Sequence, residues 1–257
     1  MPNRDSAIGV FDSGIGGLTV LQQIIEALPS ENTVYLGDTA RSPYGTKSVD
    51  TVLRYSFENT EFLVEKGVKI VVLACNTSTA IALEPLQKKL AIPVVGVIAP
   101  GVKRAVASTK NKKIGVIGTE ATIQSGARVS RGLQPGLSAL RPAGRGRLDG
   151  QPSRRMTVKT YLESLKQSGI DTLILGCTHY PLLKKAIGKF LGGGVHLVDS
   201  AEETAREVRA MLKRAWLARQ RGNGSHGFFV TDAPERFIKV GRRFLGERVE
   251  SAVRIER

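Results

Sequence analysis

Apolar positions along the chain gather in short continuous runs rich in β-branched residues, separated by longer segments with a helical apolar period. Continuous runs predict buried strands, and the periodic segments predict helices. The predicted strands are AIGVFD (7–12), TVYLGD (33–38), KIVVLAC (69–75), PVVGVI (93–98), KIGVIG (113–118), TLILGC (172–177), VHLVDS (195–200) and GFFVTD (227–232). The predicted helices span Gly17–Leu28, Val49–Lys66, Thr77–Leu90, Thr157–Ser168, Pro181–Phe190 and Ala201–Arg219.

This alternation predicts an α/β fold with mostly parallel sheets, because continuous apolar strands are typical of sheets covered by helices on both faces. The chain also repeats itself: IGVFDSG at Ile8 is similar to IGVIGTE at Ile114, and VVLACNT around Cys75 is similar to LILGCTH around Cys177. We therefore expect two pseudosymmetric domains, 1–98 with a C-terminal return at 208–257 and 99–207, and an active site in the cleft between them.

Composition narrows the class of protein. A chain of 257 residues with 41% hydrophobic content is long enough for one large or two small packed domains. The two cysteines do not make a disulfide framework, and the first residues, MPNRDSAIGVFD, hold no apolar signal core. No apolar run reaches the roughly 18 residues of a membrane span. These features predict a soluble, cytoplasmic protein with no membrane contact.

The net charge of +15 suggests attraction to anionic partners such as nucleic acids. The segment from Arg128 to Arg155 is rich in arginine, glycine and proline, and Asp149 is its single acid. It has no aromatic residue on which a base could stack, so we interpret it as a loop and do not favour nucleic-acid binding as the function.

Both cysteines end predicted strands, where ligands of open α/β sheets bind. Each stands before a predicted helix start, which is expected to lower a thiol pKa from about 8.5. A disulfide, a metal half-site and inert core cysteines are the alternatives. Cys177 and His179 alone do not make the four-ligand set of a structural zinc site, so no metal is expected.

Further polar groups follow other predicted strands. Asp12 and Ser13 precede a glycine-rich turn, a common anion-binding element. Asp38 follows the second predicted strand, where a ribose-binding acid would stand, so a nucleotide site remains an alternative. Tyr44 offers a phenol in a loop, and Thr119 a hydroxyl that is either a ligand or a helix cap. Two thiols on opposite sides of a ligand suit inversion at carbon: one thiolate removes a proton and the other thiol delivers one.

Five motifs together, FDSGIGGLTVL, GDTARSPYGTKS, ACNTSTA, GTEATIQSG and GCTHYPLL, resemble the glutamate racemases of the cofactor-independent aspartate/glutamate racemase superfamily. The resemblance implies interconversion of L- and D-glutamate for peptidoglycan synthesis by a homodimer, without cofactor. It implies that Cys75 and Cys177 are the catalytic bases, assisted by Asp12 and His179. The substrate-binding residues that it implies are Asp12, Ser13, Tyr44, Gly45, Asn76, Thr77, Thr119, Thr178 and His179.

The segment 128–156 departs from this family. Its sequence, RVSRGLQPGLSALRPAGRGRLDGQPSRRM from Arg128, lacks the apolar strand and the glutamates that the resemblance leads us to expect. A racemase of another acidic amino acid such as aspartate, or an impaired relative acting as a binding protein, are therefore the alternative functions.

Overall fold

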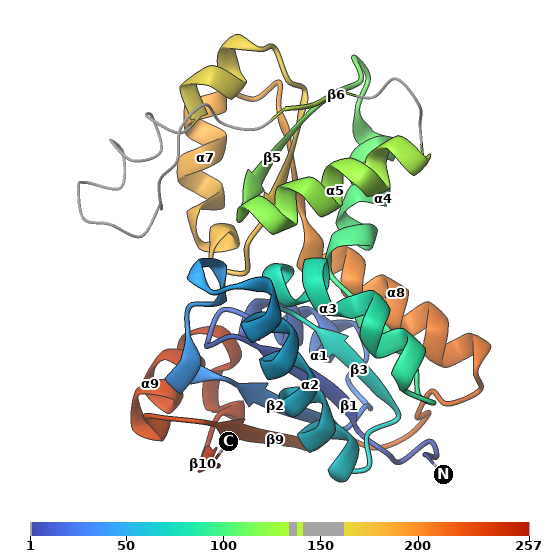
Figure 1. Ribbon diagram of the computed structural model, residues 1–257. Helices are drawn as coiled ribbons and strands as arrows, with labels where there is room; N and C mark the ends of the chain where they lie inside the picture. Colours follow the sequence, from blue (N-terminus) through green and yellow to red (C-terminus); the bar gives the residue numbers. More distant parts are fainter. Residues whose placement is uncertain (1, 134–137, 141–161, 257) are drawn as a thin grey trace. The chain divides into compact units, whose positions relative to one another are not determined.

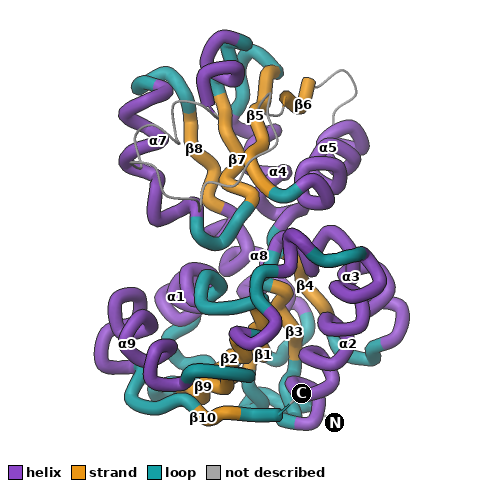
Figure 2. The backbone as a smooth tube through the Cα atoms, turned by 60° about the vertical axis from the view of Figure 1, so that its left-hand side comes forward, coloured by secondary structure: helices purple, strands orange, loops and turns teal. Residues whose placement is uncertain are grey.

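The computed structural model describes residues 2–133, 138–140 and 162–256, which divide into two compact units. The first unit comprises Met1–Val97 and Ala201–Arg257, and the second comprises Ile98–Ser200. Each unit contains one sheet with helices on both sides (Figures 1 and 2). Every strand pairing between described residues is parallel, so the predicted α/β class is confirmed.

The sheet of the first unit has the strand order β10-β9-β2-β1-β3-β4. Its strands are β1 (Ile8–Asp12), β2 (Thr33–Gly37), β3 (Ile70–Leu73), β4 (Val94–Gly96), β9 (His226–Val230) and β10 (Val253–Arg254). Its helices are α1 (Leu18–Ala27), α2 (Val49–Glu65), α3 (Asn76–Lys89), α8 (Ser200–Arg214) and α9 (Pro234–Leu245), with short 3-10 turns η1 (Thr39–Arg41), η2 (Tyr44–Thr46) and η4 (Gly246–Arg248).

Alternate residues of these strands point to opposite faces and build two separate cores. Val10 and Val72 face α1, α8 and α9, whereas Phe11, Val71 and Leu73 face α2 and α3. Both faces are therefore buried, which explains why the strands are apolar without interruption.

The second unit contains a sheet of strand order β6-β5-β7-β8. Its strands are β5 (Lys113–Gly118), β6 (Ser138–Leu140), β7 (Thr172–Gly176) and β8 (His196–Asp199). Helices α4 (Ile98–Ser108) and α5 (Glu120–Leu133) contact β7 and β5 respectively. Leu162 and Leu165, in a helical stretch at 162–167, pack with Ile187 of α7 (Lys184–Leu191) in one core, and η3 (Tyr180–Leu183) precedes α7.

The two sheets share a strand order and a pairing register. In each, the first strand of the repeat lies between the second and the third, and the fourth follows the third. Ile8 pairs with Ile70, and Ile114 pairs with Thr172. Equivalent positions of the two first strands, such as 8 and 114, are thus 106 residues apart in the sequence. Equivalent positions of the two third strands, such as 70 and 172, are 102 residues apart. This register makes Cys75 and Cys177 equivalent.

Two expectations about the chain path need correction. The segment 128–156 was expected to lack a strand, yet Ser138–Leu140 forms β6 and pairs with β5; residues 141–156 lie outside the described ranges. The return to the first unit begins at Ala201, earlier than the expected residue 208, because Ala201, Ala205 and Val208 all pack in the core beneath α1.

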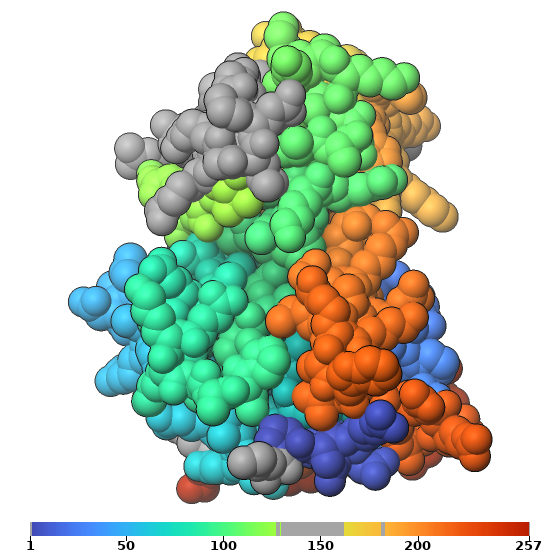
Figure 3. Space-filling view, turned by 90° about the vertical axis from the view of Figure 1, so that its right-hand side faces the viewer, coloured from blue at the N-terminus to red at the C-terminus, as the bar shows by residue number. Residues whose placement is uncertain are grey.

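The sequence patterns did not predict α4, α5, α9 or the short β10. The helix that starts at Ser200 ends at Arg214, before the predicted Arg219, and Trp216 then has a φ of 57°. The chain turns there toward the N-terminal residues, and Arg4 Nε donates to the Trp216 carbonyl at 3.0 Å. Figure 3 shows this side of the molecule, with N-terminal residues (dark blue) beside the end of α8 (orange). Within the described residues, no helix is both long and apolar enough to cross a membrane.

Candidate active site

The carboxyl ends of β1 and β3 bring Asp12 and Cys75 to one edge of the first sheet. Asp12 is the last residue of β1, and Cys75 follows β3 by two residues. Ala74 N donates to Phe11 O at 2.9 Å, which keeps the two chain segments paired beyond β3. The Asp12 side chain is fully buried, and its Oδ2 accepts a hydrogen bond of 3.0 Å from Gly14 N.

The glycine-rich turn after β1 allows helix α1 to start directly beside Asp12. A Cβ atom on Gly17 would lie 2.4 Å from the Asp12 Cβ, closer than real side chains approach, so only glycine fits there. A Cβ on Gly37 would lie 2.7 Å from Gly14 O, and Tyr35 OH donates to the same oxygen at 2.9 Å. The turn is therefore packed tightly around Asp12.

Cys75 occupies the N-cap position of α3 and is only 6% exposed. Burial raises the pKa of its thiol, and the negative charge of Asp12 raises it further. Hydrogen bonds with Ser78 and Ser13 act in the opposite direction but do not outweigh these two causes. The expected net lowering of the Cys75 pKa is therefore wrong: the backbone at the start of α3 does lower it, but desolvation and a neighbouring carboxylate outweigh that effect.

Tyr44 contacts Cys75 and Val52 in one apolar cluster, and its hydroxyl is buried. The hydroxyl donates to Asp38 Oδ2 and accepts from Asn59 Nδ2 at 2.9 Å. Burial, followed by the Asp38 charge and hydrogen bond, raises the pKa of Tyr44 far above its ordinary value. The phenol is thus neutral and held in a protein network, while Gly45 beside it is exposed.

Asp38 does not fit the nucleotide site that the sequence left open. Its carboxylate is fully buried and accepts hydrogen bonds from Tyr44, Arg41 and Thr231. A ribose-binding acid must reach its ligand, and this one is committed to protein donors. Asn76 and Thr77 form the first residues of α3, next to Cys75, and both are largely buried.

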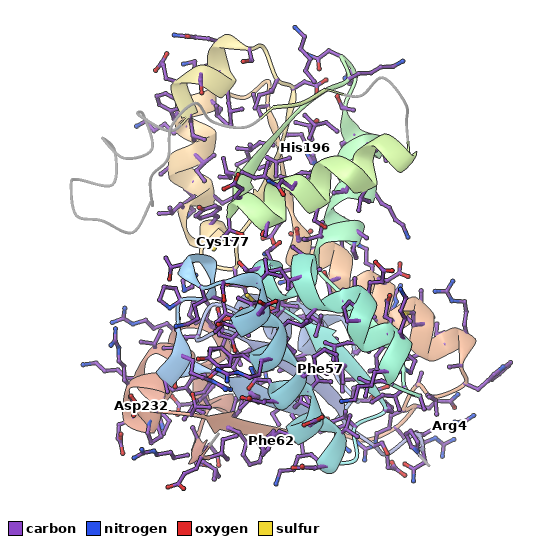
Figure 4. All side chains as sticks on the ribbon, viewed as in Figure 1. Arg4, Phe57, Phe62, Cys177, His196 and Asp232 are labelled. Carbon is purple, nitrogen blue, oxygen red and sulfur yellow. The ribbon has the colours of Figure 1, made fainter. Side chains whose placement is uncertain are left out.

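Cys177 follows β7 at the equivalent edge of the second sheet, and Figure 4 labels it there. It is partly exposed, and its Sγ lies 3.8 Å from His179 Nδ1. Tyr180 N donates to Cys177 O at 3.0 Å, which closes the turn into η3. Thr178 is buried and His179 is exposed, so the imidazole beside this thiol is open to solvent.

Thr119 follows β5 and caps α5. Its Oγ1 accepts from Thr122 N at 3.4 Å and lies 2.9 Å from the Thr122 hydroxyl. The prediction that Thr119 caps a helix is therefore confirmed, and its role as a ligand stays a prediction. The glycines at this edge let the strands approach closely, since a Cβ on Gly176 would lie 2.6 Å from Ile117 O.

The structure thus gathers the candidate residues into two sets, each at one sheet edge. We call Asp12, Ser13, Tyr44, Gly45, Cys75, Asn76 and Thr77 the Cys75 group, and Thr119, Cys177, Thr178 and His179 the Cys177 group. Sequence reasoning missed Ser78, whose backbone N–H interacts with the Cys75 thiol and lowers its pKa. Its position three residues into the helix after Cys75 was the available signal. Over the described residues, no group of three or more His, Cys, Asp or Glu side chains could hold a metal ion.

Comparison with known proteins identifies the class to which this fold and these cysteines belong. Residues 8–208 match the model of the Asp/Glu/Hydantoin racemase family. The chain belongs to this family and is an isomerase, as the five motifs indicated.

Within the family, the similar proteins are glutamate racemases. The glutamate racemase of Geobacter metallireducens is 52% identical over 95% of this chain and 94% of its own length. Among solved structures, glutamate racemase isoform RacE1 from Bacillus anthracis has a TM-score of 0.92 and 42% identity over 98% of both chains. The Francisella tularensis glutamate racemase, solved in complex with D-glutamate, has a TM-score of 0.88 and 34% identity over 98% of both chains.

Proposed function

We propose that this protein is a glutamate racemase that interconverts L- and D-glutamate with Cys75 and Cys177 as its two acid–base groups. The observation that carries this proposal is the equivalence of the two cysteines in the pairing register of two matching sheets. The names of the similar proteins supply the substrate.

In the proposed reaction, residues of the Cys75 group and of the Cys177 group both bind the one glutamate. One thiolate takes the α-proton from one face of the substrate, and the other thiol gives its proton to the opposite face. The configuration inverts, and the two cysteines exchange protonation states. Cys75 is the base for one enantiomer and Cys177 for the other, and the intermediate is stabilised by hydrogen-bond donors of the site.

Asp12 and His179 manage protons beside the two thiols in this proposal. The charge of Asp12 contributes to the raised pKa of Cys75, so a substrate ammonium bound next to Asp12 would offset that charge and ease deprotonation. In the free enzyme, the Asp12 charge favours the protonated form of the Cys75 thiol. His179, whose Nδ1 lies 3.8 Å from the Cys177 sulfur, exchanges a proton with that thiol in this proposal.

The remaining assigned residues bind the substrate. Small hydroxyl and amide side chains suit its amino and carboxylate groups, which need several donors and acceptors at fixed positions. We assign this role to Ser13, Tyr44, Gly45, Asn76, Thr77, Thr119 and Thr178. Because the Tyr44 hydroxyl is committed to Asp38 and Asn59, the Tyr44–Gly45 segment would act through its ring and backbone.

The test is incubation with L-glutamate in D₂O. Loss of optical rotation together with deuterium at the α-carbon of both enantiomers is expected, and prior dialysis against EDTA should leave the rate unchanged. Absence of turnover, or faster turnover of aspartate, would contradict the assignment. We also propose that the enzyme is a cytoplasmic homodimer that supplies D-glutamate for peptidoglycan; light scattering after gel filtration tests the dimer.

A further inference from the structure

The buried carboxylate of Asp38 joins three consecutive elements of the first unit, η1, η2 and α2, to the turn after β9, whose Thr231 is 193 positions away. It is fully buried and forms an ion pair with Arg41, whose Nε lies 2.8 Å from Oδ2. Its other donors are the hydroxyl of Tyr44, Asn59 Nδ2 at 3.3 Å and Thr231 Oγ1 at 2.9 Å. These donors come from η2, from α2 and from the turn after β9.

Arg41 extends this network and supplies the positive charge opposite Asp38. Its guanidinium also pairs with Glu58, donates to Asn59 Oδ1 at 3.1 Å, and lies 4.0 Å from the centre of the Tyr55 ring. Tyr55 in turn packs against the cluster of Tyr44 and Cys75. A buried charge is tolerated only when it is paired and hydrogen-bonded, so the network has one low-energy arrangement.

That arrangement fixes Tyr44 at two points. Its hydroxyl is held between Asp38 and Asn59, and its ring packs in one apolar cluster with Val52 and Cys75. We infer that Asp38, Asn59 and Thr231 are positioning residues that hold the Tyr44 ring against the Cys75 thiol and so shape this half of the site. The inference rests on the proposed function, in which the Tyr44–Gly45 segment and Cys75 both meet the substrate.

Thr231 gives the sharpest test because its hydroxyl has two partners. It donates to Asp38 and accepts from Ala40 N at 2.9 Å. Thr231→Val keeps the shape and removes both bonds, whereas Thr231→Ser keeps the hydroxyl. The effect of a lost hydroxyl can therefore be separated from the effect of a changed shape.

Thr39 supplies a matched control. It joins the same two chain segments through Asp232, donating to Asp232 O at 2.6 Å and accepting from Asp232 N at 2.8 Å, and neither bond involves the Asp38 carboxylate. Figure 4 labels Asp232, directly after Thr231. Thr39→Val therefore loosens the connection between these segments without altering the carboxylate network.

The experiment measures kcat and KM for both glutamate enantiomers and the rate at which iodoacetamide alkylates Cys75, with Cys177 as internal reference. Thr231→Val should lower kcat/KM about tenfold, because a displaced binding wall misplaces the substrate. It should also speed alkylation of Cys75 several-fold. Thr231→Ser and Thr39→Val should stay within about twofold of the parent protein.

Equal behaviour of Thr231→Val and Thr231→Ser would overturn the inference, and so would an equal effect of Thr39→Val. If the parent protein does not racemise glutamate but Thr231→Val alone speeds alkylation of Cys75, the proposed function fails and the positioning role is supported. If Thr231→Val does not fold, Tyr44→Phe releases the ring from Asp38 directly and should speed alkylation in the same way; no change would overturn the inference.

Discussion

The Cys75 group and the Cys177 group stand at equivalent positions of two similar sheets but in different surroundings. Cys75 is buried beside the carboxylate of Asp12, and its thiol pKa is raised. Cys177 is partly exposed and lies beside the imidazole of His179. At the position equivalent to Asp12 the second sheet has Gly118, so no carboxylate stands at the corresponding strand end.

This difference shows that the repeat preserves the backbone positions of the two thiols and not their electrostatics. In the proposed mechanism the reaction runs in both directions, and the two thiols act on mirror-image substrates from unlike protein environments. Each thiol therefore needs its own means of setting its proton affinity. The four predictions below compare equivalent positions of the two units, in order of falling effect.

The largest effect is expected from the cysteines themselves. Cys75→Ser and Cys177→Ser should each lower the racemisation rate by on the order of 10²–10⁴, because a serine hydroxyl is a far poorer base than a thiol. Polarimetry from both enantiomers measures this. Circular dichroism of each variant controls for folding. Normal racemisation by either variant would contradict the prediction that both cysteines are needed for the reaction.

Sequence patterns predicted the parallel strands and the two cysteine-bearing strand ends, because buried parallel strands are apolar throughout and their ends are marked by polar residues. They could not predict the direction of the Cys75 pKa shift. That depends on how deeply the thiol is buried and how near Asp12 lies, and these residues are far apart in the chain. The same holds for Asp38, whose partner Thr231 is 193 positions away.

The second comparison concerns Lys69 and Asp171, equivalent residues just before the third strands. Lys69 is fully buried; its Nζ pairs with Glu31 at 2.5 Å and donates to Leu217 O at 2.9 Å. Lys69→Met leaves the Glu31 carboxylate buried without its cation and should cost about 3–5 kcal/mol of unfolding free energy. Chemical denaturation at pH 7 measures this loss.

Asp171 is partly buried, and its side chain accepts from Thr109 Oγ1 and from Lys110 N, both at 2.6 Å. Burial opposes ionisation, but these bonds and one from Asn111 N outweigh it and lower the Asp171 pKa to about 2. Asp171→Asn should cost about 1 kcal/mol at pH 7.

The Asp171 contribution to stability should be present above the unfolded-state pKa of about 3.9 and lost as pH falls toward about 2.

The exposed pair of Lys88 and Glu84 on α3 is the control for Lys69→Met. Lys88→Met should change the unfolding free energy by less than about 0.5 kcal/mol. A Lys69→Met cost no greater than that of the control would contradict a stabilising role for the buried pair.

The third prediction concerns the charge beside Cys75. Because the Asp12 carboxylate raises the pKa of that thiol, Asp12→Asn should move the pH midpoint of Cys75 alkylation downward and leave that of Cys177 unchanged. Mass spectrometry of the two cysteine peptides after timed iodoacetamide treatment gives both midpoints in one experiment.

Asp50→Asn, in the first turn of α2, removes an exposed carboxylate from the same unit and should leave both midpoints unchanged. An unchanged Cys75 midpoint in Asp12→Asn would mean that burial alone raises the thiol pKa. The electrostatic difference between the Cys75 group and the Cys177 group would then come only from the deeper burial of Cys75.

The smallest effect is expected at Ser13 and Thr119, which are equivalent residues at the ends of the first strands. Ser13 hydrogen-bonds the Cys75 thiol and lowers its pKa, so Ser13→Ala should shift the Cys75 alkylation midpoint upward with little change in stability.

Thr119 instead caps α5, so Thr119→Val should cost about 1 kcal/mol of unfolding free energy. Thr119→Ser should restore that stability, because its hydroxyl can still accept from Thr122 N. If Thr119→Ser restores stability but not the KM for glutamate, the threonine methyl group also shapes the substrate site; if both return together, the hydroxyl is sufficient for both roles.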